Sequence, residues 1–123
     1  LGVLFYRGEK DPETSILDGC IQIKGMYGLN IEFSEIADIS LIEKSMREIG
    51  IGVRTNGYGG IGGALKGNFK SNTLGETLLF VWPNSSPTIK IERIGSKDVY
   101  ISCRNSESTR QLYLELKESV PLK

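Results

Sequence analysis

The sequence predicts a single, mainly β domain of about seven antiparallel strands with one helix at its C-terminal end. Apolar and polar residues alternate along most of the chain, as in strands that have one buried face. Turn segments rich in glycine, asparagine and serine separate these strands, and a helical period appears only near the end. With 123 residues, the chain is long enough for one domain with its own hydrophobic core.

The first residues of the chain allow two interpretations. The opening, LGVLFYR at residues 1–7, fits an edge strand of a sheet. It also fits the end of a longer hydrophobic segment, with Tyr6 and Arg7 at the positions of an interfacial aromatic and a positive charge. A polar stretch follows, so we expect residues 1–13 to be a connector, or the stub of a membrane-proximal segment. The domain is then expected over residues 14–120.

A hairpin is predicted over residues 16–33. Ile21 and Ile23 alternate with polar residues in its first strand, and a glycine-bounded turn over residues 25–28 leads into the second. Periodicity does not decide the secondary structure of the following stretch, residues 34–49. Its apolar residues fit a helical stripe, whereas the alternation around residue 40 fits a strand.

The centre of the chain, residues 50–63, contains seven glycines and predicts an irregular loop that is either mobile or tightly turned. Within it, residues 57–62 match the spacing GxGxxG of dinucleotide-binding loops. That motif works only between a parallel strand and a helix, and no helix-length pattern follows here. Strand patterns resume afterwards, and residues 77–82 are apolar on both faces, as in a fully buried strand. The later strands are expected at 65–70, 89–92 and 99–103.

The last element is predicted to be an amphipathic helix. Asn105 and Ser106 offer capping oxygens, and Pro121 ends the pattern. Between them, Leu112 and Leu116 recur four residues apart, which places them on one face of the helix. We expect both leucines to be buried against the β-structure.

The composition excludes several classes of function. Because the chain contains no histidine, it can build no Ser-His-Asp triad, Cys-His pair or histidine-containing zinc site. Fifteen basic and fifteen acidic residues give no net charge, which argues against nucleic acid as a partner. Cys20 and Cys103 lie in the apolar phase of predicted strands, so we expect two reduced, inward-facing thiols, with one disulfide as the alternative. We expect no catalytic residue, no metal and no cofactor.

Positive charge is concentrated in residues 44–70. Five basic residues stand against one acid, Glu48, which gives this stretch of 27 residues a charge of +4. One interpretation is a surface that meets anionic lipid headgroups, phosphate or an acidic partner. The other is a solvated face without a partner. We predict that the interaction face is formed by Arg54, Tyr58, Lys66 and Lys70.

Several segments of the chain share the pattern of one family. They are residues 21–28, 34–39, 54–58 with 66–69, and the strand around Ile101 followed by Ser108-Thr109 and Leu112-Tyr113-Leu116. Together they resemble the bacterial pleckstrin-homology-like (PH-like) domains of membrane-associated proteins, and the resemblance covers residues 14–120. The Arg-Thr-Asn-Gly and Lys-Gly-Asn-Phe segments at its centre are its most specific part.

This resemblance implies a PH-like barrel of two orthogonal antiparallel sheets, capped by the C-terminal helix. It makes residues 36–43 a strand, and it implies a binding or assembly module on the cytoplasmic side of a membrane. Relatives often carry transmembrane helices beside the domain, here outside this chain. Eukaryotic PH domains that bind phosphoinositides carry basic residues around the first hairpin loop. Here Lys24 is the only cation near that loop.

Three functions follow from the sequence, in order of preference. The first is a non-enzymatic binding or scaffolding domain, the soluble part of a bacterial membrane protein of unknown biological role. The second is a peripheral module that binds anionic lipid through residues 44–70. An unrecognised enzyme is the third. The expected partner is therefore a protein or an anionic membrane surface.

Overall fold

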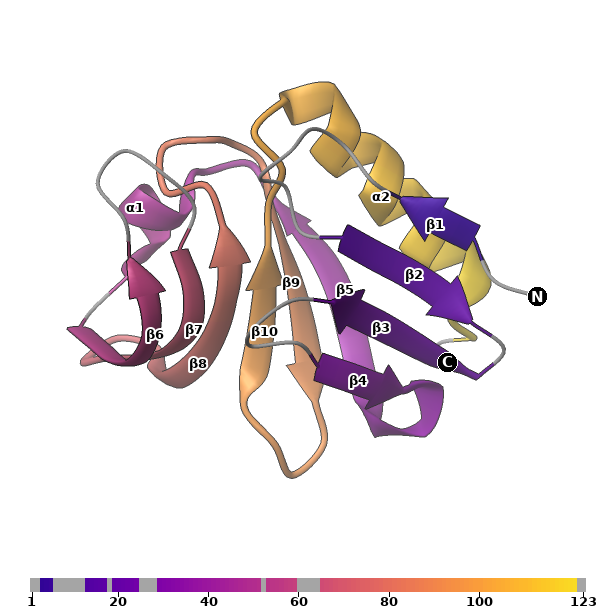
Figure 1. The fold of residues 1–123 in the computed structure, drawn as a ribbon, viewed down its shortest axis with the longest axis horizontal. Coiled ribbons are helices and arrows are strands. Elements are labelled where there is room, and N and C mark those ends of the chain that lie inside the picture. Colours follow the sequence, from indigo (N-terminus) through magenta and orange to yellow (C-terminus); the bar gives the residue numbers. More distant parts are fainter. Residues whose placement is uncertain are drawn as a thin grey trace.

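The fold is mainly β, with two sheets and a long helix at the C-terminal end (Figure 1). This description is based on a computed structural model, which describes residues 3–5, 13–17, 19–24, 29–51, 53–59 and 65–121. Within these residues there are ten strands: a four-stranded sheet in the order β1-β2-β3-β4 and a six-stranded sheet in the order β5-β9-β10-β8-β7-β6. The two sheets do not close into one hydrogen-bonded barrel.

The first sheet is an antiparallel meander of β1 (Val3–Phe5), β2 (Glu13–Leu17), β3 (Cys20–Lys24) and β4 (Leu29–Glu32). The predicted hairpin is confirmed as β3 and β4, while its turn, residues 25–28, lies outside the described residues. Strand β1 falls within the stretch that was predicted to be a connector, and it pairs with β2. The isoleucines of this sheet are buried on one face: Ile16, Ile21, Ile23 and Ile31.

The second sheet is mixed, which differs from the seven antiparallel strands predicted. It contains β5 (Ile36–Ile42), β6 (Val53–Gly59), β7 (Leu65–Ser71), β8 (Gly75–Val81), β9 (Thr88–Arg93) and β10 (Asp98–Ile101). Strand β10 pairs antiparallel with β9 but parallel with β8. The prediction missed this parallel pair because a period of two shows which residues face the core and says nothing of the neighbour's direction.

The ambiguous stretch after the first hairpin contains both kinds of structure. A 3-10 turn, η1 (Phe33–Glu35), leads into β5, so the strand that the resemblance implied is confirmed almost to its end. Helical structure is confined to α1 (Met46–Ile49). The side chain of Ser45 accepts a hydrogen bond from the backbone of Glu48, and the side chain of Glu48 accepts one from the backbone of Ser45. This capping box starts the short helix.

The glycine-rich centre is not wholly irregular, which corrects the sequence-based expectation. Residues 53–59 form β6, an edge strand whose one partner among the described strands is β7. The register shifts between Arg54 and Asn56, as at a β-bulge. An edge strand needs one partner and tolerates bulges and glycines, which explains how this sequence can be a strand. Residues 52 and 60–63 lie outside the described residues.

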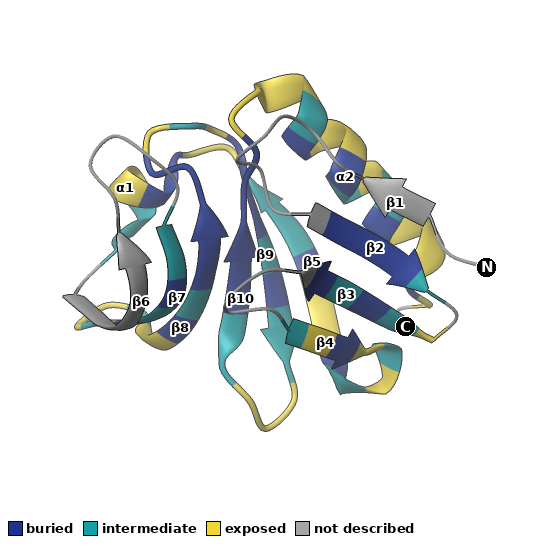
Figure 2. Ribbon diagram, in the orientation of Figure 1, coloured by how far each residue is buried: buried dark blue, intermediate teal, exposed yellow. Residues whose placement is uncertain are grey.

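Two hydrophobic cores lie on opposite faces of the second sheet. Figure 2 shows that the central strands of this sheet are largely buried. The first core joins this sheet to the first sheet and to the C-terminal helix, and it includes Ile21, Ile31, Phe80, Ile91 and Leu116. The second core lies beneath α1 and includes Met46, Phe69, Leu79, Val81 and Tyr100. Strand β8 contributes to both cores, so its prediction as a strand buried on both faces is confirmed.

The C-terminal helix is α2 (Ser106–Ser119), as predicted. Its N-cap residue, Asn105, accepts a 2.7 Å hydrogen bond at Oδ1 from the backbone N–H of Glu107. Leu112 and Leu116 are both buried in the first core. The helix is therefore an integral part of the fold.

Both cysteines are free thiols, and their burial differs. Cys103 is buried in the first core, as predicted. Cys20 is only half-buried, because it alternates with the buried Ile21 and therefore faces the other side of the first sheet, opposite the exposed Glu32. The expectation of an inward-facing thiol is met in full only by Cys103.

Replacing Leu116 with alanine should destabilise the domain by about 2–5 kcal/mol, because it leaves a cavity in the first core. Leu116 is 0% exposed, whereas Leu114 on the same helix is 58% exposed. Leu114→Ala is thus a matched control and should change stability by less than about 0.5 kcal/mol. Chemical denaturation measures both. Equal stability of Leu116→Ala and the parent would contradict the packing described here.

Alkylation should distinguish the two thiols in the native protein. Cys20 should react faster than Cys103, because its thiol is only half-buried. Cys103 should react only when the domain unfolds, because buried thiols are inert. Mass spectrometry of peptides after timed treatment with iodoacetamide gives the two rates. Modification of Cys103 as fast as that of Cys20 would be inconsistent with its burial.

Candidate functional site

The predicted interaction face centres on strands β6 and β7. Lys66 is half-buried and Lys70 is exposed, and both are on β7. They are four residues apart in a regular strand, so their side chains project from the same face of the sheet. On β6, Tyr58 is in register with Lys66, and Arg54 is in register with Phe69. The side chains of Arg54 and Tyr58 lie outside the described residues.

The structure does not bring all the cations of residues 44–70 to one face. Phe69 belongs to the second core together with Met46 of α1. Because Lys66 and Lys70 alternate with Phe69 along β7, they face the opposite side of the sheet from α1. Lys44 and Arg47 are exposed beside α1, on the far side. A stretch that is contiguous in sequence thus presents positive charge on both faces of the sheet.

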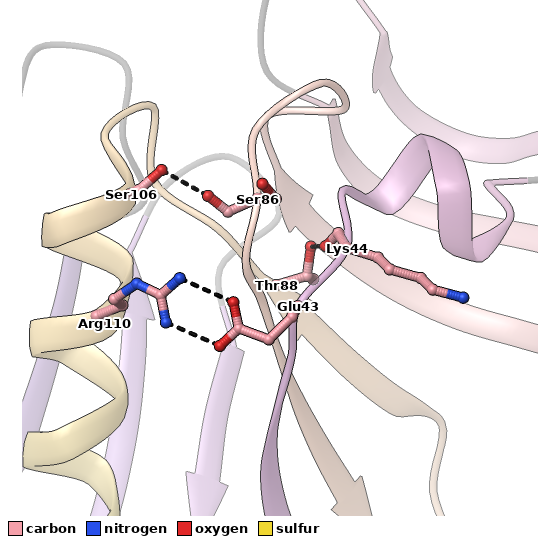
Figure 3. Close-up of polar contacts among 6 residues, drawn as sticks. All are labelled: Glu43, Lys44, Ser86, Thr88, Ser106 and Arg110. Atoms are coloured by element: carbon pink, nitrogen blue, oxygen red, sulfur yellow. Dashed lines mark hydrogen bonds and ion pairs between the residues drawn. The ribbon is translucent and has the colours of Figure 1, made fainter.

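A polar cluster near the start of α2 fastens this helix to the second sheet (Figure 3). The guanidinium of Arg110 donates two 2.8 Å hydrogen bonds to the carboxylate of Glu43. Ser106 Oγ donates to the carbonyl of Ser86 at 2.6 Å. Thr88 Oγ1 donates to the carbonyl of Lys44 at 2.9 Å, while the ammonium of Lys44 extends away from the cluster. Hydrogen bonds from Arg110 lower the pKa of Glu43, so this contact is ionic at neutral pH.

Two further arginines contact the segment that follows β8. The Nε of Arg47 donates a 2.7 Å hydrogen bond to Oδ1 of Asn84. The guanidinium carbon of Arg104 lies 5.4 Å from the centre of the Trp82 ring, within the range of a cation–π contact. Both arginines therefore help to hold this segment in place.

A hollow that the sequence analysis missed lies beside the turn between β9 and β10. Its volume is about 620 Å³, and we call it the turn hollow. It is lined by Asn68, Leu78, Arg93, Gly95, Ser96 and Lys97. Residues 95–98 were recognised in the sequence only as a turn. The hollow depends on β7 and the β9–β10 turn being brought to either side of β8, and no local pattern reveals that arrangement.

Within the turn hollow, two cationic side chains are held in place. The ammonium of Lys97 donates a 2.7 Å hydrogen bond to Oδ1 of Asn68 on β7. It lies 3.9 Å from a carboxylate oxygen of Glu76, beyond hydrogen-bond distance. The Nε of Arg93 donates to the carbonyl of Lys97 at 2.7 Å. The side chain of Asp98 accepts a 3.4 Å contact from the backbone N–H of Arg93.

A buried tyrosine and a neighbouring lysine face the second core. Tyr100 on β10 is in register with Lys90 on β9, and burial raises the pKa of the Tyr100 phenol. Burial alone would lower the pKa of Lys90, but Tyr100, Glu92 and Asp98 outweigh it and raise that pKa. Both groups therefore keep their usual protonation at neutral pH, and neither is prepared to act as a base. No group of three or more potential metal ligands occurs among the described residues.

Two further findings bear on the function. Within the part of the chain that the structure describes, no helix has the length and apolar character required to cross a bilayer. No protein-family model, curated protein or solved structure matches the chain. The PH-like resemblance therefore stays an interpretation of the sequence.

Replacing Arg110 with glutamine should raise the pKa of Glu43 towards its ordinary value of 4.5, because the hydrogen bonds that lower it are lost. Since the pKa is lowered in the folded state, the contact contributes stability above pH 4.5 and loses it as the pH falls through the folded value. Carboxyl NMR titration measures the shift. Lys117→Gln, two turns along the same helix, is the control. An unchanged Glu43 pKa in Arg110→Gln would refute the contact.

Proposed function

We propose that this chain is a non-enzymatic binding domain of the PH-like type, the soluble part of a bacterial membrane protein. The observation that carries this proposal is the polar face of β7. Lys66 and Lys70 project from one face of the sheet, and neither has an acidic partner within 4.0 Å among the described residues. Of the other two predicted residues on the adjacent strand, Tyr58 is in register with Lys66 and joins them in the proposed interaction face, whereas Arg54 is in register with Phe69.

The fold supports the PH-like part of the proposal. Two sheets pack together, and the C-terminal helix buries Leu112, Leu116 and Val120 in the core between them. A PH-like barrel uses its C-terminal helix in this way, closing the open side between its sheets. An orthogonal, barrel-like packing of the two sheets, the cytoplasmic location and flanking transmembrane helices outside this chain are the finer parts of the proposal.

The chemistry of the side chains favours binding over catalysis. The chain has no histidine, so the commonest general base is absent. A catalytic lysine or tyrosine needs a lowered pKa to lose its proton near neutral pH, whereas the pKa values of Lys90 and Tyr100 are raised. Neither of these groups is therefore prepared for acid–base catalysis.

A second candidate function is direct binding of anionic lipid through residues 44–70, and the exposure of cations in this stretch favours it. Among the described residues, Lys44, Arg47 and Lys70 are exposed and Lys66 is half-buried. Lys44 and Arg47 contact the segment that leads into β9, away from Lys66 and Lys70 on β7. Each lysine or arginine near an anionic membrane surface contributes about 1 kcal/mol.

The double variant Lys66→Gln/Lys70→Gln, which neutralises both lysines, should leave the fold intact and weaken the binding of the domain to its target. The expected loss is about 1 kcal/mol per charge, or about fivefold each, if the target is an anionic bilayer. Adding Arg54→Gln should weaken it by a similar factor. Co-sedimentation with anionic and neutral vesicles at low and high salt provides the measurement.

Lys44→Gln separates the two candidates, because Lys44 is on the other face of the sheet. If the domain binds anionic lipid through residues 44–70, this variant also weakens vesicle binding. A domain that binds a protein through β7 should not bind anionic vesicles. A photo-crosslinking residue at position 70 should then form a crosslink to that protein in native membranes. Attachment of the triple variant to vesicles and membranes equal to that of the parent would refute both.

A further inference from the structure

The turn hollow has a defined floor and two walls. Leu78 on β8 is in register with Asn68 on β7 and with Val99 on β10, so these three side chains share one face of the sheet. Leu78 packs against the first core and forms the floor. Asn68 stands on one side of it, and Arg93 and the β9–β10 turn stand on the other.

Lys97 reaches across this floor from the turn to β7. Strand β8 lies between β10 and β7. The 2.7 Å hydrogen bond from Lys97 to Asn68 therefore passes over Leu78 on β8. Gly95 in the same turn has a φ of 74°, in the left-handed region that glycine adopts without strain. The hydrogen bond from Arg93 to the carbonyl of Lys97 fixes the turn from its other end. The two cations are thus positioned before any ligand arrives.

Their positive charge is only weakly balanced. Within the hollow, Lys97 and Arg93 are held by an amide oxygen and a backbone carbonyl, which are neutral acceptors. The opposing carboxylates among the described residues are Glu76, at 3.9 Å from Lys97, and Asp98, which accepts a 3.4 Å contact from the backbone N–H of Arg93. Glu76 is largely exposed, so its contact with Lys97 is screened by water.

We propose that the turn hollow binds a phosphate monoester group. Such a group carries close to two negative charges and three acceptor oxygens, which match a lysine ammonium and an arginine guanidinium. The hollow is shallow and open to solvent, so a phosphate group can lie in it while the moiety attached to that group extends outward. This site goes beyond the proposed function and is independent of Lys66 and Lys70, which do not line it.

The phosphate can come from a soluble ester or from a lipid headgroup such as that of phosphatidic acid. Ile94 bears on this choice because it stands between Arg93 and Gly95 at the rim and is 65% exposed. An apolar side chain beside an anion site suits a membrane surface, where the headgroup and the acyl chains are adjacent. The experiment therefore includes both sources.

The direct test is an NMR titration with inorganic phosphate and with glycerol phosphate at constant ionic strength. The amide signals of Gly95, Ser96 and Lys97 should shift saturably. Lys97→Met, which keeps the apolar stem, should weaken binding at least tenfold. Lys117→Met is the matched control on α2 and should bind as the parent does.

Asn68→Asp distinguishes a binding role from a structural one. It keeps the oxygen that accepts from Lys97 and adds a negative charge inside the hollow. If Lys97 serves only to hold the turn, this variant folds and leaves any phosphate-induced shifts unchanged. We expect instead a folded protein, with unchanged thermal midpoint or a higher one, that has lost phosphate binding at least tenfold.

Vesicles that contain phosphatidic acid form the second arm. Binding that is lost in Asn68→Asp and weakened in Ile94→Ser supports a lipid source, and binding of the soluble phosphates alone supports a soluble ester. Absence of saturable binding in both arms, or equal binding by Asn68→Asp and the parent, would overturn the proposal. Lys66→Gln/Lys70→Gln should retain phosphate binding, so the failure of the β7 face and the failure of the turn hollow are separate results.

Discussion

Strand β8 supplies side chains to both hydrophobic cores, with Phe80 in the first and Leu79 and Val81 in the second. The first sheet and α2 pack against one face of the second sheet, while α1 packs against the other. The packing on both faces depends on β8, because this strand is apolar on each face and is hydrogen-bonded to a neighbouring strand on each side. The functional surfaces follow from this constraint, because polar side chains can face solvent only where neither layer covers the sheet.

Strand β7 and the β9–β10 turn are such places. Phe69 fills the second core, so the residues that alternate with it, Lys66, Asn68 and Lys70, lie on the other face. The first core covers that face at β10 and β9, and its coverage diminishes at Leu78, which is only partly buried. The proposed interaction face and the turn hollow thus share one strand. They use different side chains of it, with the two lysines in one and the asparagine in the other.

The sequence predicted the features that depend on local alternation and capping. The β3–β4 hairpin, the doubly buried β8 and the leucine stripe of α2 are all visible in the order of apolar residues. The parallel pairing of β10 with β8 was not visible, because β9 intervenes in the chain and strand direction leaves no trace in a period of two. Proximity in sequence likewise suggested one basic patch over residues 44–70. Alternation along β7 instead places Lys66 and Lys70 on the face opposite α1, apart from Lys44 and Arg47. The turn hollow joins residues from three strands and a turn, so it required the tertiary structure.

The pairing of β5 with β9 has a consequence for how the domain reaches this structure. Ile39 and Ile91 are register partners about fifty residues apart in the chain, and three strands of the same sheet lie between them in sequence. Bringing them together closes a long loop, which costs conformational entropy. This cost is smaller once the intervening strands are already ordered. Strands β7 and β8, and likewise β9 and β10, are short-range neighbours that can pair early. Strand β5, although it precedes all of them in the chain, would then complete the sheet late, and the first core with it.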